Sequence, residues 1–124
     1  GAIGNPFIFR EVRGLLAGRP LPDAPSIAEQ RAALERHYSL MVELHGEELA
    51  APLLRKFVVR YSELHPCFTE VKMAFLAVKN ANDWRAMIDR WYGDEHLYPP
   101  VTRRARPEAL IAAGASWDCQ AEPV

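Results

Sequence analysis

Hydrophobic residues recur along this chain at spacings of three and four, the pattern of amphipathic α-helices. The clearest case is the segment from Leu53 to Leu64, whose apolar side chains fall on one arc at about 100° per residue. They are Leu53, Leu54, Phe57, Val58, Tyr61 and Leu64. Lys56 and Arg60 lie together just outside one edge of this arc, and Arg55 lies well round on the polar side. We expect a helix that buries a wide apolar face and holds cations at its boundary with solvent.

Two helices are predicted before this segment. Asn5 and Pro6 are suited to the start of the first, which is expected to stop at Gly18. Ser26 to Glu29 has the form of a capping box, and the helix it opens is expected to end at Gly46. The apolar faces are Phe7, Ile8, Phe9, Val12, Leu15 and Leu16 in the first helix, and Ile27, Leu34, Tyr38, Met41 and Leu44 in the second.

The central helix is expected to begin near Glu47 and to end before His65-Pro66, with Pro52 either close to its regular start or at a kink. A shorter helix is predicted from Thr69 to Lys79. It should bury Val71, Phe75 and Val78 and carry Lys72 and Lys79 on a common stripe.

A last helix is predicted to start at a capping Asn82 and to close at Gly93. Its aromatic face, which we interpret as core, is formed by Trp84, Met87, Ile88, Trp91 and Tyr92. Residues 94–124 give weak signals: either Pro107 to Ala113 forms a short helix or this tail is disordered. With no strand alternation anywhere, the sequence predicts an all-α fold, a small helical bundle.

Composition limits the chain to one ordinary globular domain, with 124 residues of which 49% are hydrophobic. The net charge of −1 conceals an uneven distribution, because residues 53–79 hold five bases and two acids whereas residues 21–52 hold two bases and six acids. Nothing resembles a membrane span or a signal peptide. Cys67 and Cys119 have neither metal-ligand spacing nor a disulfide framework, which suits a cytoplasmic protein.

Catalytic equipment is scarce in this sequence. His37 and His45 lie eight residues apart on one largely apolar face, which favours partly buried histidines over a metal site. Cys67 has no acidic, basic or histidine partner arranged around it, so we expect a structural thiol rather than a nucleophile. The remaining signal is cationic and aromatic, and it is typical of a surface that tracks phosphates. Its basic residues are Arg55, Lys56, Arg60, Lys72 and Lys79.

Two motifs resemble the tRNA-dihydrouridine synthases, flavin enzymes that reduce uridine in tRNA. The run from Gly1 to Glu11 resembles the family's "GNPWIFR" motif between the last barrel strand and the final barrel helix, with Phe7 in place of the usual Trp. Leu54-Arg55-Lys56-Phe57 followed by Tyr61 resembles the family's "MRKH…WY" segment, with Phe57 in place of His. The resemblance covers roughly residues 1–92.

The resemblance implies that residues 1–18 are a remnant of the (β/α)8 barrel, with its last helix, and that residues 19–25 are a linker. It implies that residues 26–93 form a helical tRNA-binding domain, and it says nothing of residues 94–124. Arg55, Lys56 and Arg60 are the first candidates for tRNA phosphate contacts, with Lys72 and Lys79 second. The implied partners are tRNA and the catalytic barrel that would precede this stretch.

The same resemblance implies FMN as the cofactor of the intact enzyme and NADPH as its reductant, with no metal. Gly1 and Ala2 would form the downstream edge of the flavin phosphate site. The family's catalytic Cys lies in an "N-x-G-C-P" segment that is absent here, so no catalytic residue is assigned. We therefore expect this chain neither to catalyse the reaction alone nor to retain a tightly bound flavin.

Two alternatives remain open at this stage. The first is a helical protein-interaction module that docks through Phe7, Phe9 and the aromatic face, with cations that only solubilise it. The second is a small enzyme that uses Cys67 or His37.

Overall fold

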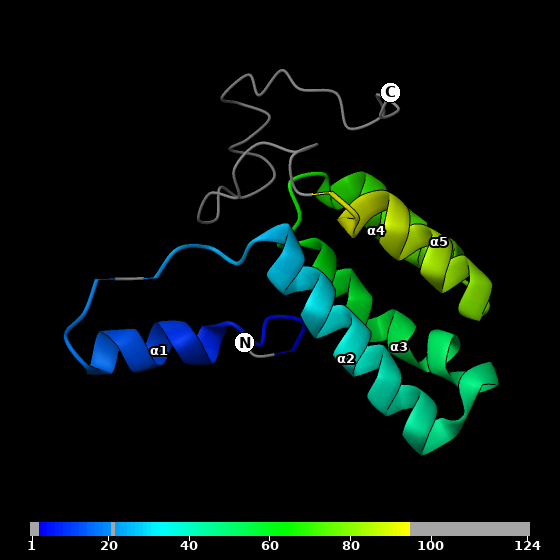
Figure 1. Cartoon of the computed structure of the whole chain (residues 1–124), viewed down its shortest axis with the longest axis horizontal. Helices are drawn as coiled ribbons and strands as arrows, with labels where there is room; N and C mark the ends of the chain where they lie inside the picture. The colour runs from blue at the N-terminus through cyan, green and yellow to red at the C-terminus, as the bar shows by residue number, and fades with distance from the viewer. Residues whose placement is uncertain (1–2, 21, 95–124) are drawn as a thin grey trace.

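The computed structural model describes residues 3–20 and 22–94, which form five α-helices (Figure 1). These are α1 (Ile8–Leu16), α2 (Ile27–His45), α3 (Glu47–Ser62), α4 (Phe68–Ala77) and α5 (Ala81–Tyr92). These described residues contain no strand, which confirms the all-α prediction. The predictions for residues 1–2 and 94–124, including a helix at Pro107 to Ala113, lie outside the described residues apart from Asp94.

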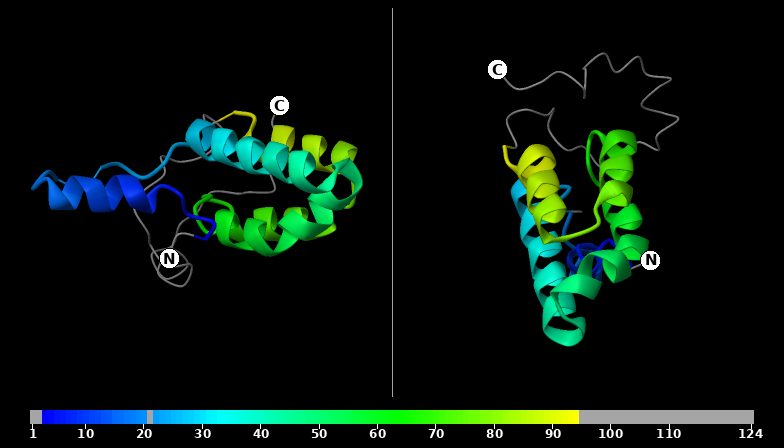
Figure 2. Two further views of the ribbon diagram at one scale, coloured as in Figure 1. Left: turned by 90° about the horizontal axis from the view of Figure 1, so that it is seen from below. Right: turned by 90° about the vertical axis from the view of Figure 1, so that its right-hand side faces the viewer.

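Helices α2 to α5 form a bundle of two layers, with α2 and α5 in one layer and α3 and α4 in the other (Figure 2). Helix α3 packs against all three other members of the bundle. Helix α1 lies outside this arrangement and points away from one end of the bundle (Figure 1).

The core lies between the two layers and draws side chains from all four helices. Leu34, Leu54, Phe75 and Ile88 represent the four helices there, and each is almost fully buried. The aromatic face of α5 is also buried, as predicted. It therefore packs inside this chain, and the part of the docking hypothesis that used this face is wrong.

Side-chain caps fix the starts of α2 and α5. Ser26 Oγ accepts the backbone N–H of Glu29 at 3.1 Å, which confirms the predicted cap of α2. The cap of α5 is Asn80, whose Oδ1 accepts the N–H of Asp83 at 2.9 Å, so the prediction of Asn82 is wrong. The reason is spacing: Asn80 is three residues before Asp83, as a capping box requires, whereas Asn82 already lies inside the helix.

Helix α1 begins later than predicted and has no side-chain cap. Its first residue is Ile8, and the Ile8 N–H reaches the carbonyl of Asn5 at 3.3 Å in a turn. Neither Asn5 nor Pro6 therefore starts the helix. None of its residues is buried, so the apolar face predicted for this helix is left open: Phe9 is 61% exposed and Leu16 is 84% exposed.

A buried histidine ties the connection between α3 and α4 to the end of α5. His65 is 2% exposed; its Nε2 lies 2.7 Å from the carbonyl oxygen of Trp91, and its Nδ1 accepts the N–H of Cys67 at 2.9 Å. Because Nδ1 is an acceptor, the ring proton belongs on Nε2, where it donates to Trp91. Burial lowers the pKa of His65 to about 4, although its hydrogen bond to Trp91 opposes this shift.

We predict that the bundle loses stability as the pH falls from about 6.5 to about 4. The pKa of His65 is lower in the folded chain than its usual 6.5, so folding favours the neutral ring and the stabilisation is complete only above the unfolded pKa. At 1.36 kcal/mol per pKa unit, the loss should approach about 3 kcal/mol at pH 4. Urea unfolding at a series of pH values measures this loss.

The matched control replaces an exposed histidine on α2. His65→Gln should be less stable than the wild type at pH 7 and should lose much of the pH dependence, whereas His45→Gln should retain it. A wild-type stability that stays flat between pH 7 and pH 4 would contradict this account of His65.

Candidate nucleic-acid interface

Helix α3 presents two cations on the side opposite the core. Leu54 and Val58 are buried against the neighbouring helices, whereas Lys56 and Arg60 are exposed and stand one turn apart. The buried arc of α3 also includes Ala50, Ala51 and Ser62, while Leu53 is 37% exposed. The core-facing side is thus rotated away from Leu53 relative to the sequence prediction, which leaves Lys56 and Arg60 facing outward.

Both outward cations keep their charges accessible. The Nζ of Lys56 lies 5.0 Å from the centroid of the Phe57 ring, a cation–π contact that does not neutralise the ammonium group. The Nη1 of Arg60 lies 3.3 Å from Glu63 Oε1, and both side chains are more than half exposed. An exposed ion pair of this kind contributes at most about 1 kcal/mol, so a phosphate can displace it.

Arg55 has a different role from its neighbours on α3. It is half-buried, and its Nη2 donates a hydrogen bond of 3.1 Å to the carbonyl oxygen of Val78, just beyond α4. Its Nε is buried and has no hydrogen-bond partner among the described residues. The structure therefore places this guanidinium in the contact between α3 and the end of α4, where it ties the two helices together.

Lys72 and Lys79 are both exposed, but they do not share one helical stripe. Helix α4 ends at Ala77 because Val78 adopts an extended conformation, with φ −69° and ψ 125°. Lys79 therefore lies in the connection to α5, where its backbone N–H donates to Asp83 Oδ2 at 3.1 Å. The prediction that both lysines share one helical stripe is therefore wrong: Lys72 is on α4, and Lys79 lies beyond its end.

The side chains considered for catalysis or metal binding, His37 and Cys67, are engaged in contacts within the bundle. The Nδ1 of His37 lies 3.2 Å from the Tyr61 hydroxyl oxygen, its ring packs 5.1 Å from Phe57, and burial lowers its pKa. Cys67 is buried and is not a free thiol, so the expectation of a free structural thiol is wrong and this candidate nucleophile is lost. Within residues 3–20 and 22–94, no group of three or more His, Cys, Asp or Glu side chains could hold a metal ion.

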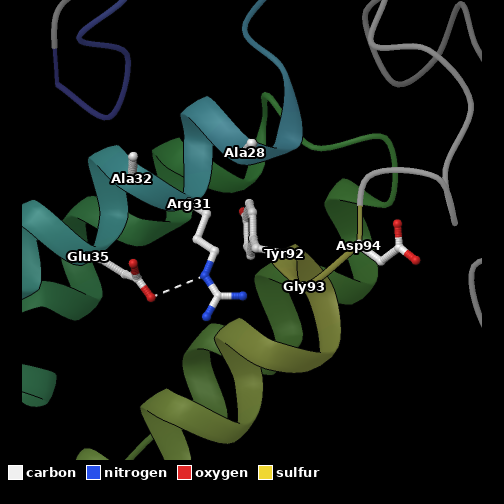
Figure 3. Close-up of a pocket in the computed structure, with 7 residues that line it drawn as sticks. All are labelled: Ala28, Arg31, Ala32, Glu35, Tyr92, Gly93 and Asp94. Carbon is white, nitrogen blue, oxygen red and sulfur yellow. Dashed lines mark hydrogen bonds and ion pairs between the residues drawn. The ribbon is translucent and has the colours of Figure 1, made fainter.

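A pocket of about 330 Å³ opens between α2, the end of α5 and the residues that follow it (Figure 3). Arg31 stands at its centre, beside the ring of Tyr92. Its guanidinium is held by Glu35 at 3.1 Å and by Asp89 at 2.9 Å, and the hydrogen bonds to these two carboxylates raise its pKa against the effect of burial. Because Arg31 is already paired with two carboxylates, it is poorly placed to bind a phosphate in this pocket.

Two of the predicted site residues, Gly1 and Ala2, lie outside the described residues. Across the part of the chain that the structure describes, no helix is long and apolar enough to cross a membrane. The described residues thus form a small helical bundle, with an exposed cation pair on α3 and a separate amphipathic helix before the bundle.

The known proteins whose sequences resemble this chain share one family name. The chain is 28% identical over 121 residues to a probable tRNA-dihydrouridine synthase of Mycobacterium leprae, covering 94% of this chain and 31% of that protein. It is 32% identical over 74 residues to a probable tRNA-dihydrouridine synthase of Rickettsia conorii, covering 60% of this chain and 22% of that protein. It is 27% identical over 92 residues to tRNA-dihydrouridine synthase B of Proteus vulgaris, covering 73% of this chain and 28% of that protein.

The chain is therefore similar to tRNA-dihydrouridine synthases over most of its length, which supports the family membership that its two motifs indicated. It spans between about a fifth and a third of the length of these curated relatives. No family model and no solved structure matches it.

We predict that Arg55 and Lys56, although adjacent, contribute unequally to stability. Arg55→Ala removes a charged hydrogen bond to a half-buried carbonyl and should lower the free energy of unfolding by about 1–2 kcal/mol. Lys56→Ala alters an exposed surface position and should change it by less than about 0.5 kcal/mol. Urea unfolding of both variants measures the difference, and equal losses would show that Arg55 does not tie α3 to α4.

Proposed function

We propose that this chain acts as the helical tRNA-binding part of a flavin-dependent tRNA-dihydrouridine synthase, an enzyme that reduces uridine to dihydrouridine. The observation that carries the proposal is the exposed pair Lys56 and Arg60, which face outward from α3 within the segment that resembles the family's basic motif. Family membership supplies tRNA as the expected ligand, because the relatives are named for it.

The contribution of the bundle is electrostatic and positional. Lysine and arginine side chains that contact phosphates add affinity and set the register of the RNA, but they select little of its sequence. Folded RNA is recognised largely by shape and by its backbone, which suits a rigid helical surface. Lys56 and Arg60 are the primary phosphate contacts in this proposal, and exposed Lys72 and Lys79 are secondary ones. Arg55 supports the surface through its bond to Val78 and has less freedom to reach a phosphate.

Helix α1 is proposed to belong with the catalytic barrel of the enzyme. Its apolar side chains Phe9, Val12 and Leu15 are each about half exposed or more, as expected of a helix whose partner is another part of a larger protein. Residues 1–18 would then be the end of the barrel, and residues 19–25 would be the linker to the tRNA-binding bundle. The protein is proposed to work in the cytoplasm, where tRNA is modified.

FMN and NADPH enter this proposal only through the family resemblance. The residues that the structure describes do not fit a flavin: the pocket beside α2 offers two alanines, a tyrosine ring and an arginine already paired with carboxylates. Gly1 and Ala2 remain the proposed edge of the flavin phosphate site. The bundle's own contribution is to hold tRNA, and no step of the reduction is assigned to its side chains.

A protein-interaction module with no role in nucleic-acid binding is the second candidate. The open apolar face of α1 favours it, because such a face is suited to docking on a protein. The dependence of tRNA affinity on salt separates the two functions. Binding through several phosphates weakens steeply as salt rises, whereas apolar docking does not.

We predict that Lys56→Ala combined with Arg60→Ala weakens tRNA binding and leaves the bundle folded. Loss of two phosphate contacts should reduce the slope of log affinity against log salt by about 1–2, because each contact contributes about 0.7–0.9. Filter binding or fluorescence anisotropy with tRNA at 50–300 mM salt, about the range where phosphate contacts dominate, measures both affinity and slope.

The matched control removes the same charge from the other layer of the bundle. Arg36→Ala combined with Arg85→Ala replaces two exposed arginines on α2 and α5 and should leave the slope near its wild-type value. Unchanged affinity of the Lys56/Arg60 variant at low salt would remove these residues from the binding role. An equal loss in both double variants would mean that net charge, and not this surface, determines binding.

A further inference from the structure

The segment that precedes α1 lies directly against the backbone of α3. Gly4 is buried, although Ile3 before it is exposed and Asn5 after it is only partly buried. A Cβ added at Gly4 would overlap the Cβ of Arg60 and would lie 2.8 Å from the Arg60 carbonyl carbon and 2.9 Å from the Tyr61 nitrogen. Contacts shorter than 3.0 Å to backbone atoms cannot be relieved by turning a side chain. Only glycine allows this approach.

The conformation of Gly4 gives a second reason for glycine at this position. Its φ is +72°, in the left-handed region that residues with a Cβ rarely adopt. The left-handed turn lets the chain press onto α3 and then leave towards α1. The contact therefore depends on both the backbone angle and the missing side chain.

Arg10 provides another connection between α1 and the residues that follow it. Arg10 of α1 forms an ion pair with Glu29 in the first turn of α2, and its Nη2 donates to the carbonyl oxygen of Asp23 at 3.3 Å. Both side chains of this ion pair are more than 40% exposed, so it contributes little by itself. Since α1 buries none of its own residues, the close approach of Gly4 to Arg60 is the best-defined anchor of the segment.

We infer that Gly4 is a positioning residue, which sets the direction of α1 relative to the face of α3 that carries Lys56 and Arg60. Gly4 packs against the backbone of Arg60, while the guanidinium of the same residue stays exposed beside Lys56. Any structure joined through residues 3–16 is thereby held at a defined angle to that surface. The contact itself does not depend on tRNA binding; its use in presenting tRNA to a catalytic unit rests on the proposed function.

Nuclear magnetic resonance of the isotope-labelled 124-residue chain tests this inference without RNA. In the wild type, the N–H residual dipolar couplings of α1 and of α2 to α5 should fit one alignment tensor, and α1 should tumble with the bundle. In Gly4→Ala, the couplings of α1 should fall by at least about half and need a separate tensor, because the overlap with Arg60 forces the segment off α3. The couplings of the bundle should stay as in the wild type.

Gly18→Ala is the matched control. Gly18 also has a positive φ, of +69°, but an added Cβ would meet nothing within 4 Å, so this variant carries the backbone strain without the overlap. Its α1 couplings should still fit the common tensor. The inference is overturned if α1 moves independently in the wild type, if Gly4→Ala keeps the common tensor, or if both variants release α1 equally. Because RNA is absent, none of these outcomes depends on whether the bundle binds tRNA.

Discussion

Helix α3 buries Leu54 and Val58 between its neighbours and packs against α2, α4 and α5 together. A helix enclosed on so much of its circumference has only one side left for solvent, and on α3 that side carries Lys56 and Arg60. The packing of the core therefore decides which cations are presented outward. The N-terminal segment also packs against α3, through Gly4. A single helix therefore contributes to the core, carries the exposed cations and contacts the segment that leads into α1.

Polar contacts fix the helix ends around this core. His65 joins the α3–α4 connection to the end of α5, and Arg55 joins α3 to the end of α4 through the Val78 carbonyl. Both satisfy carbonyl groups at or just beyond helix C-termini, where no intrahelical donor is available. Arg31 links α2 to α5 on the other layer through Asp89. Charge in this bundle is thus placed in two ways: Arg31 and Arg55 hold helices together, whereas other cations, Lys56 and Arg60 among them, stay exposed.

Much of the fold was accessible from sequence, for reasons that are local. Helix positions, the Ser26 cap and the apolar face of α5 follow from spacings of three or four residues within one segment. The errors were also local in origin. The predicted cap, Asn82, lies two residues past the observed cap, Asn80, and the predicted α4 stripe runs past Ala77, because helical periodicity does not itself mark where a helix begins or ends. Similarity to the family was indicated by two short motifs, and the comparisons support it.

The sequence by itself determined that residues 3–20 and 22–94 are all-α, which faces are apolar and that the middle of the chain is basic, since periodicity and composition are properties of single segments. Only the tertiary structure decided that Arg55 turns to the Val78 carbonyl while Lys56 and Arg60 stay outside. It also decided that α1 leaves its apolar face open and that Gly4 rests on Arg60. These outcomes depend on which helix lies beside which, and helical periodicity shows how a face is composed but not what covers it.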